Sequence, residues 1–336
     1  MSSVSPERIL KLGYAYREAK VLLSAVELGV FTALAEAKAP LAVETLTNRI
    51  GINKRGARDF FDALVALELL DRDDIGRYAC RPETALYLDR QKPTYLGDEL
   101  EYSNAPLYGR WNLLTRALKS GKPQNAVVGK VYPGLYADPT ALEAFAKAMS
   151  AVTLQAATAI AAKFPWPQYQ TVIDIGSAQG CLPVQIAHVY AHLAGGGFDL
   201  PPIEPVFDRY VKKYGLSSRL RFYPGDFFQD PLPTADVLIM GRVLHNWDLA
   251  TKKMLLKKAY DALPAEGALI VYERLIDDER RVNATGLLSS LNMLIMTEGG
   301  FEFTAADCVG WMHEIGFRDF RVEPLTSDQS MIIGMK

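Results

Sequence analysis

The stretch Thr171-Val-Ile-Asp-Ile-Gly-Ser-Ala-Gln-Gly180 combines a short apolar strand, an acidic residue and a turn of small residues. Small residues at 176, 178 and 180 let the backbone turn tightly and approach a ligand, which longer side chains would prevent. The spacing, Gly-x-Ala-x-Gly after an acidic residue, differs from the Gly-x-Gly-x-x-Gly of dinucleotide-binding enzymes. Alone, the pattern also fits an ordinary tight turn.

Strand and helix patterns alternate from this stretch to the C-terminus. Strands are expected at 171–175, 197–200, 220–223, 235–240, 268–273 and 331–334, and helices up to 191 and at 202–214, 250–263 and 305–315. This alternation predicts an α/β fold with a mostly parallel sheet covered by helices on both faces. Ligands bind outside the carboxyl ends of such strands, so functional residues should follow them.

Two further strand ends carry an acidic residue. Asp199 lies in Phe198-Asp-Leu-Pro201, and Asp226 lies in Gly225-Asp-Phe-Phe228. A carboxylate at the second strand end can accept hydrogen bonds from both ribose hydroxyls, and an aromatic beside a carboxylate could hold the face and edge of adenine. Each could be a solvated loop carboxylate, but three features after successive strands favour an adenosine pocket.

One histidine follows the fourth strand, in Gly241-Arg-Val-Leu-His-Asn-Trp-Asp248, and Glu273 ends the fifth. A lone histidine is more often structural than catalytic. Here a carboxylate from the neighbouring strand end could bind the ring and fix its tautomer, leaving the other nitrogen as a base. Ordinary helix positions are expected for His188, His192 and His313.

The residue pattern of the N-terminal part predicts one long amphipathic helix at 17–37, followed by a winged helix-turn-helix. Helices are expected at 40–50 and 54–70, followed by a hairpin that ends with 76–80. Lys54, Arg55 and Arg58 could contact DNA, but acidic residues in the same unit favour dimerisation instead. An exposed apolar helix face would be a liability on a monomer, so we expect a homodimer.

Residues 92–163 read as interrupted helices with many aromatics, which suits a cap over a ligand cleft or ordinary core. Asp138 is a candidate N-cap for a helix at 139–163, and Phe164-Pro-Trp-Pro167 ends it. The predicted domains are therefore 1–100 for dimerisation, 101–163 for connecting helices and substrate cap, and 164–336 for the α/β domain.

Composition narrows the function classes. The 336 residues suffice for two domains, and 49% hydrophobic and 23% charged residues are globular values. A formal net charge of -2 disfavours nucleic acid as the main ligand. Three widely spaced cysteines exclude a disulfide framework or structural zinc site. With no signal-peptide pattern and an apolar run of only 15 residues at 148–162, we expect a soluble cytoplasmic protein without a membrane partner.

Together these segments resemble the S-adenosylmethionine-dependent O-methyltransferases. The resemblance lies in the winged-helix-like N-terminal part and in segments 174–180, 198–201, 225–228 and 242–248, together with Gly300-Phe-Glu-Phe-Thr304. These motifs are individually weak but jointly specific, and they cover nearly the whole chain. The similar branch contains plant caffeic-acid-type, hydroxyindole and bacterial polyketide or phenazine enzymes of secondary metabolism.

The resemblance implies a Rossmann-like methyltransferase domain, a helical winged-helix-like dimerisation domain and S-adenosylmethionine as cofactor. It implies that the turn at Gly176 holds the methionine part, Asp199 the ribose, and Asp226 with Phe227 the adenine. Further cofactor contacts are implied at Leu200 and Arg242.

The resemblance also implies that His245 is the general base, flanked and oriented by Glu273 and Glu302. The acceptor is an aromatic small molecule, and the implied lining residues are Phe145, Met149, Trp247, Met293 and Thr297. A base helps because ionising a phenol of pKa ~10 at pH 7 costs about 4 kcal/mol. No metal is expected, because no close acidic trio suited to magnesium follows the predicted strands.

The chain departs from the family pattern at three places. Ala178 replaces the usual middle glycine, Gly195-Gly-Gly197 predicts a loose second strand, and Thr297 stands where plant members often carry asparagine. Plant substrate specificity therefore does not transfer. Two alternatives remain open: a family member repurposed for decarboxylation, hydroxylation or pericyclic chemistry, and a winged-helix regulator that senses a small ligand.

Overall fold

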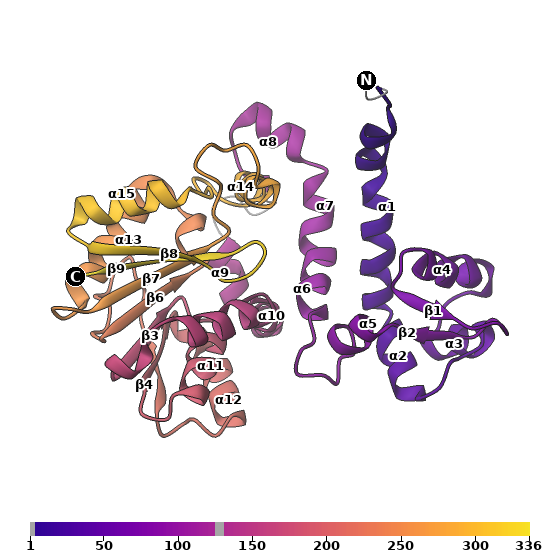
Figure 1. Cartoon of the computed structure of the whole chain (residues 1–336), viewed down its shortest axis with the longest axis horizontal. Coiled ribbons are helices and arrows are strands. Elements are labelled where there is room, and N and C mark those ends of the chain that lie inside the picture. Colours follow the sequence, from indigo (N-terminus) through magenta and orange to yellow (C-terminus); the bar gives the residue numbers. More distant parts are fainter. Residues whose placement is uncertain (1–3, 125–130) are drawn as a thin grey trace. The chain divides into compact units, whose positions relative to one another are not determined.

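The computed structural model describes residues 4–124 and 131–336 and divides the chain into two compact units, Met1–Tyr108 and Gly109–Lys336 (Figure 1). The first unit is mainly helical. The second contains a seven-stranded sheet covered by helices. All the predicted site residues belong to the second unit.

The first unit has the predicted order of helix, turn, helix and hairpin. Its elements are α1 (Glu7–Glu27), α2 (Val30–Ala37), α3 (Val43–Ile50), α4 (Lys54–Ala66), β1 (Leu70–Arg72), β2 (Tyr78–Cys80), α5 (Pro82–Tyr87), α6 (Gly97–Tyr102) and a π-helical turn at Ser103–Leu107. The prediction of one helix over 17–37 is wrong, because Gly29 adopts a left-handed conformation (φ 70°) between α1 and α2.

The core of this unit lies among α1 to α4 and the hairpin, with Phe31, Phe61 and Tyr78 almost fully buried. The hydroxyl of Tyr78 donates a hydrogen bond of 2.8 Å to Asp62 and so ties the hairpin to α4. The first half of α1 contributes nothing to this core. Its exposed apolar or aromatic residues are Ile9, Leu10, Leu12, Tyr14 and Tyr16.

The sheet of the second unit has the strand order β5-β4-β3-β6-β7-β9-β8. The strands are β3 (Thr171–Ile175), β4 (Ala194–Asp199), β5 (Leu220–Pro224), β6 (Val237–Gly241), β7 (Ala268–Glu273), β8 (Arg318–Pro324) and β9 (Ser330–Met335). Strands β3 to β7 pair in parallel, and β9 pairs antiparallel with both β7 and β8. The mostly parallel α/β prediction is confirmed.

Helices cover both faces of this sheet (Figure 1). The helices that follow the first unit along the chain are α7 (Tyr108–Trp111), α8 (Leu114–Ser120), α9 (Val131–Tyr136), α10 (Pro139–Lys163), α11 (Cys181–Val189), α12 (Glu204–Lys213), α13 (Leu249–Ala262), α14 (Ala284–Met296) and α15 (Ala305–Ile315). Of these, α10 and α11 pack on one face of the sheet, and α13 and α15 pack on the other. Alternate residues of β3 serve opposite faces: Val172 packs with α10 and α11, and Ile173 belongs to the core shared with α13 and α15.

The helix α10 is a core element. Asp138 caps it, accepting hydrogen bonds from the backbone N–H groups of Thr140 and Ala141. By length and composition alone this 25-residue helix could cross a membrane, so the apolar run of 15 residues expected at 148–162 underestimates its length. However, Ala156, Ala157 and other residues of α10 are buried against the sheet and α11.

The glycine run at 195–197 forms a regular strand, so the predicted looseness is wrong. Strand β4 pairs in parallel with β3 on one side and β5 on the other. Gly195 and Gly196 have φ values of 142° and 152°, and an added Cβ would lie 1.8 Å from the Val172 carbonyl oxygen and 1.7 Å from that of Arg221. The pairing therefore requires glycine here and holds Asp199 in register.

Candidate functional site

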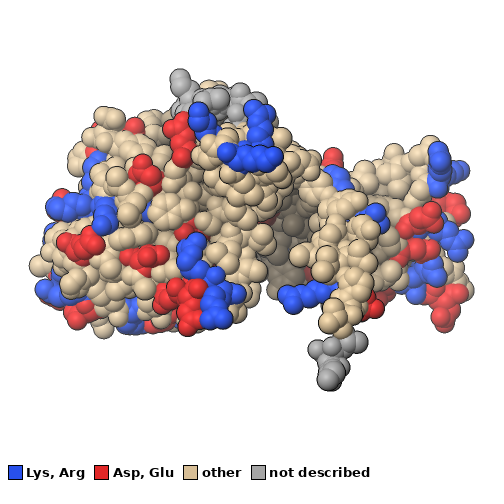
Figure 2. Space-filling view, turned by 90° about the horizontal axis from the view of Figure 1, so that it is seen from above, with Lys and Arg blue, Asp and Glu red and all other residues tan. Residues whose placement is uncertain are grey.

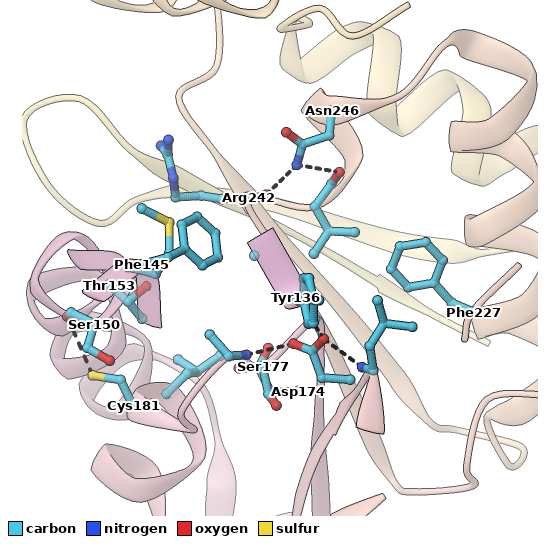
Figure 3. Close-up of a pocket in the computed structure, with 18 of the residues that line it drawn as sticks. Tyr136, Phe145, Ser150, Thr153, Asp174, Ser177, Cys181, Phe227, Arg242 and Asn246 are labelled. Atoms are coloured by element: carbon cyan, nitrogen blue, oxygen red, sulfur yellow. Dashed lines mark hydrogen bonds between the residues drawn. The ribbon is translucent and has the colours of Figure 1, made fainter. Parts of the chain in front are cut away.

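A cavity of about 410 Å³ lies at the carboxyl ends of strands β3, β4, β6 and β7, the position expected for this sheet (Figure 3). Most of the predicted cofactor and acceptor residues line it: Phe145, Met149, Gly176, Asp199, Leu200, Asp226, Phe227, Arg242 and Trp247. Lining residues that we did not predict include Tyr136, Asp174 and Tyr272.

The glycine turn at the end of β3 leaves no room for larger residues. Gly176 and Gly180 both have positive φ (76° and 84°), and an added Cβ would lie 2.8 Å from Val243 and 2.5 Å from the ring of Phe207, respectively. Ala178 adopts the same backbone region (φ 47°) and donates its N–H to Asp199. The single methyl group is accommodated, and the turn is fixed to the next strand end.

Asp199 is buried and accepts three hydrogen bonds from the protein. Its Oδ2 accepts the N–H of Ala178 at 2.9 Å, and its Oδ1 accepts the N–H of Leu200 at 2.7 Å and the hydroxyl of Tyr136 at 2.8 Å. Burial raises the pKa of Asp199, although these hydrogen bonds oppose the shift. The tyrosine, on α9, gave no local sequence signal for this contact.

Asp174 is a second buried carboxylate on the same cavity, only 6% exposed. Burial, followed by the neighbouring charge of Asp199, raises the pKa of Asp174 well above its usual range. When both carboxyls are ionised, they create a negative potential in the cavity that favours a cationic ligand. Asp174 lies in the stretch from which the fold was predicted, but no role was predicted for its side chain.

The loop after β5 contributes aromatic side chains to the lining of the cavity. Asp226 Oδ1 accepts the N–H of Phe228 at 2.9 Å, which shapes the turn. The ring of Phe227 packs edge-on against Trp247, with centroids 5.9 Å apart, and both residues line the cavity. A flat aromatic ligand such as adenine fits against this kind of surface.

Arg242 brings a positive charge to the cavity (Figure 3). It follows β6 in a left-handed conformation (φ 54°), and its N–H donates to the carbonyl of Tyr272 at 3.0 Å. Its Nε and Nη1 atoms are buried and have no hydrogen-bond partner within the described residues 4–124 and 131–336. Because a buried guanidinium needs acceptors, these atoms form a site for an anionic group.

His245 lies in a short turn at Leu244–Asn246 and forms a buried cluster with two glutamates. Its Nδ1 is 2.7 Å from Glu302 Oε1 and 3.5 Å from Glu273 Oε2. Its backbone N–H donates to Glu273 at 3.3 Å, and the hydroxyl of Ser289 donates to Glu302 at 2.6 Å. Because Nδ1 is engaged, Nε2 remains available for a substrate proton.

The two glutamates differ in their protonation. Burial raises the pKa of Glu273 to about 7. The charge of His245 opposes this shift, and the charge of Glu302 adds to it. Burial acts in the same direction on Glu302, but the charge and hydrogen bond of His245, with smaller contributions from Arg242 and Ser289, hold its pKa below the usual value. Glu302 is therefore the permanently ionised partner of the imidazole.

The same cluster bears on the expectation of no metal. The ligand atoms of His245, Glu273 and Glu302 all lie within 4.8 Å of one another, close enough to hold an ion. This cluster holds two carboxylates and one imidazole, and Glu302 comes from the loop before α15, so it is not the acidic trio after the strands that the sequence lacks. The 2.7 Å hydrogen bond between His245 Nδ1 and Glu302 Oε1 already occupies two of the atoms that an ion would bind.

The predicted acceptor residues divide into two groups. Phe145 and Met149 on α10 line the cavity, as does Trp247. Met293 and Thr297 are outside its lining: Met293 is buried on α14, and the Thr297 hydroxyl donates to the Met293 carbonyl at 2.8 Å.

The remaining histidines lie outside this cluster. His188 is on α11 and His313 on α15, as expected. The helical prediction for His192 is wrong, because α11 ends at Val189 and this ring instead contacts the carbonyl of Trp166 at 3.3 Å.

Comparison with known proteins gives consistent matches over the whole chain. The O-methyltransferase domain family profile matches residues 111–318, and the O-methyltransferase dimerisation domain profile matches residues 10–90. TcmO of Streptomyces glaucescens, a tetracenomycin polyketide synthesis 8-O-methyl transferase, is 41% identical over 98% of this chain and 97% of its own. OxyT of Streptomyces rimosus, an N,N-dimethyltransferase, is 34% identical over 92% and 90%.

The solved structures agree with the sequence matches. Human N-acetylserotonin methyltransferase in complex with SAM superimposes with a TM-score of 0.92 at 28% identity, covering 100% of this chain and 99% of that one. None of these three relatives is named for decarboxylation, hydroxylation, pericyclic chemistry or gene regulation, so they lend those alternatives no support.

Proposed function

Because the chain belongs to the O-methyltransferase family, we propose that it transfers the methyl group of S-adenosylmethionine to a hydroxyl of an aromatic, phenolic or polyketide-like small molecule. The observation that carries the proposal is the buried His245, whose Nδ1 is held by Glu302. His245 itself is not among the residues that line the cavity, but its neighbours Val243 and Asn246 are, and this cavity has the features of an adenosine site.

The residues of the cavity fit this cofactor. We assign Asp199 and the adjacent Leu200 to the ribose, Asp226 and Phe227 to the adenine, and the Gly176 turn to the methionine part; all of these residues line the cavity. The unpaired nitrogens of Arg242 suit a carboxylate such as that of the methionine part. When bound, the cofactor supplies an electrophilic methyl group on a positively charged sulfur.

The chain's own residues then handle the acceptor proton. His245 Nε2 takes the proton of the acceptor hydroxyl, and Glu302 stabilises the imidazolium that results. Phe145, Met149 and Trp247 supply the apolar surface that holds an aromatic ring and excludes water. Met293 and Thr297 act more remotely, through α14. The resulting oxygen nucleophile is oriented toward the methyl group.

The experiment is mass spectrometry of the purified protein with S-adenosylmethionine and a mixed acceptor library. We expect a gain of one methyl group on a phenolic acceptor. His245→Ala should lower turnover about 10²–10⁴-fold with little change in cofactor affinity, the usual contribution of general-base catalysis. The control is His188→Ala, an exposed histidine on α11. Turnover within threefold of wild type from pH 6 to 9 in His245→Ala would contradict the base assignment.

An amine acceptor is the second candidate, and the 34% identity to a protein named N,N-dimethyltransferase favours it. A neutral amine needs no base before attack, so proximity alone would drive the transfer. The same library should therefore contain aromatic amines. Methylation of amines that is insensitive to His245→Ala would support this candidate over hydroxyl methylation.

We also propose the oligomeric state of the enzyme and its location in the cell. We infer a homodimer formed by a winged-helix-like N-terminal domain (1–100), supported by the dimerisation profile and by the exposed apolar residues of α1. Light scattering should give twice the chain mass of 37.2 kDa. Segment 101–163 serves as connection and substrate cap. Three free cysteines fit a cytoplasmic enzyme of secondary metabolism.

Nucleic acid and membrane are not among the proposed partners. On the face shown in Figure 2, Lys and Arg side chains alternate with Asp and Glu side chains. A stripe of one sign, typical of nucleic-acid binding, is missing from that face.

A further inference from the structure

Helix α13 carries two adjacent lysine pairs, Lys252-Lys253 and Lys257-Lys258, one turn and a half apart. One lysine of each pair binds backbone carbonyl groups of a loop in the candidate site. The other lysine of each pair is exposed in a surface ion pair: Lys253 with Glu314 and Lys257 with Asp261, both at 2.5 Å. The helix therefore contains its own matched controls.

Lys252 connects the two segments that hold the base cluster. Its Nζ donates to the carbonyl of Trp247, two residues after His245. The same ammonium lies 3.4 Å from the ring centroid of Phe301, the residue before Glu302. A cation–π contact of this kind is stronger when shielded from water. One side chain thus fixes the histidine turn relative to the glutamate segment.

The burial of Lys252 is complete, with 0% exposed. Burial lowers its pKa to about 8, although the charges of Glu273 and Glu302 oppose the shift. A lysine is almost never buried unless its charge is compensated, because desolvation of an ammonium is costly. The nearby pair of glutamates provides this compensation, so the lysine belongs electrostatically to the base cluster.

Lys258 fixes the other half of the site. Its Nζ donates to the carbonyl of Phe227 at 2.6 Å and to that of Asp230 at 2.8 Å. These carbonyls belong to the loop after β5, which carries the residues assigned to adenine. Two charge-assisted hydrogen bonds from one ammonium restrain the loop where it turns.

We propose that α13 positions the two halves of the site independently: Lys252 aligns His245 with Glu302, and Lys258 holds the 226–230 loop for the cofactor. Both are positioning residues, since neither lines the cavity. This inference rests on the proposed function for the roles of the two halves. Its consequence is that the two lysines affect different kinetic constants.

The experiment compares Lys252→Met and Lys258→Met with the exposed controls Lys253→Met and Lys257→Met. Methionine keeps most of the apolar stem and removes the charge. Lys252→Met should lower kcat by about 10–100-fold, the scale of a misplaced catalytic group, with the cofactor Kd within twofold of wild type. Lys258→Met should raise the cofactor Kd by about 3–10-fold, the loss of roughly 1 kcal/mol of loop ordering, and lower kcat less than threefold.

Rescue separates positioning from general damage. Lys258→Arg keeps donors for both carbonyls and should restore most of the affinity, whereas Lys258→Met should not. If Lys252→Met does not fold, Phe301→Leu replaces it, because this change removes the ring contact but leaves the ammonium in place. Equal losses of kcat and affinity in both lysine variants, or effects no larger than in the exposed controls, would overturn the inference.

Two readouts do not need turnover. Calorimetry with S-adenosylhomocysteine measures the effect of Lys258 on the loop. The ¹⁵N spectrum of the His245 imidazole measures its Nδ1 hydrogen bond to Glu302, which should change in Lys252→Met and stay unchanged in Lys253→Met. If the wild type transfers no methyl group but these signals change as expected, the proposed function fails and the inference stands. If the wild type is active but the signals do not change, the inference fails alone.

Discussion

Replacing Glu302 with glutamine should slow methyl transfer far more than the same change at Glu273. Glu302 Oε1 lies 2.7 Å from His245 Nδ1 and is ionised, since its pKa is held below the usual value. The amide oxygen of glutamine still accepts the Nδ1 proton but has no charge to stabilise an imidazolium. A hydrogen bond to a charged group contributes about 1.5–3 kcal/mol and a neutral one about 1. The difference, up to about 2 kcal/mol, corresponds to a loss of roughly 30-fold.

Glu273→Gln should show a loss that depends on pH. The pKa of Glu273 is raised to about 7, so the carboxyl is mostly protonated at pH 6 and mostly ionised at pH 8.5. Glutamine resembles the protonated form, and the variant should match wild type within twofold at pH 6. Above the raised pKa, wild type gains a second negative charge near the imidazolium that the variant lacks. The deficit should therefore grow to about fivefold at pH 8.5, roughly 1 kcal/mol.

The assay is single-turnover methyl transfer at saturating cofactor, followed by mass spectrometry from pH 6 to 9. The Glu302→Gln deficit should be almost constant over this range, because the wild-type carboxylate stays ionised throughout. Ser289→Ala removes only one hydrogen bond to that carboxylate and should have a smaller effect. A Glu273→Gln deficit at pH 6 as large as that of Glu302→Gln would refute the assignment of different protonation states.

Three further outcomes are expected. Asp199→Ala should weaken cofactor binding about 5–150-fold in calorimetry, because the ribose hydroxyls assigned to this carboxylate lose their acceptor at a cost of ~1–3 kcal/mol; an unchanged Kd would contradict the ribose assignment. S-adenosylmethionine should bind more tightly as pH rises and Asp174, whose pKa is raised, ionises; Asp174→Asn should flatten this slope. Gly196→Ala should abolish soluble folded protein, whereas Gly109→Ala, with open space around it, should fold normally; equal thermal unfolding of both would show that β4 tolerates a Cβ.

Elements with local end signals were predicted well from the sequence. The helix 139–163 begins after the Asp138 cap, and the helix 305–315 begins at a Thr304–Asp307 capping box. Strand β8 was missed because most of its residues are exposed, which removes the apolar pattern that marks a strand. The break at Gly29 was missed because one glycine does not by itself end a helix pattern.

From the residues alone, the site was predicted where its residues follow predicted strands, whereas Phe145 and Met149 on α10 were expected only from the family resemblance. Asp199, Asp226 and His245 come directly after strands, and the parallel topology alone places them at one edge of the sheet. Tyr136 binds Asp199 across 63 positions of sequence, and no local pattern indicates that pairing. Lys252 was missed for another reason: a lysine in an amphipathic helix is normally exposed. Both contacts depend on tertiary packing.

The two pairs of buried carboxylates in the site differ in whether nearby cations of the protein act on their pKa values. Around Glu273 and Glu302 the protein supplies its own cations, since His245 and Arg242 lower the pKa of both carboxyls. Around Asp174 and Asp199, no cation within residues 4–124 and 131–336 contributes to either pKa, and burial raises both.

Two buried carboxylates without a cation are unfavourable unless they are protonated or a ligand brings the charge. S-adenosylmethionine carries positive charge on its sulfur and its amino group. We therefore expect its binding to stabilise the ionised forms of the two carboxylates at the ends of β3 and β4. Because methyl transfer removes the sulfonium charge, we expect the demethylated cofactor to bind this pair of carboxylates more weakly than S-adenosylmethionine does.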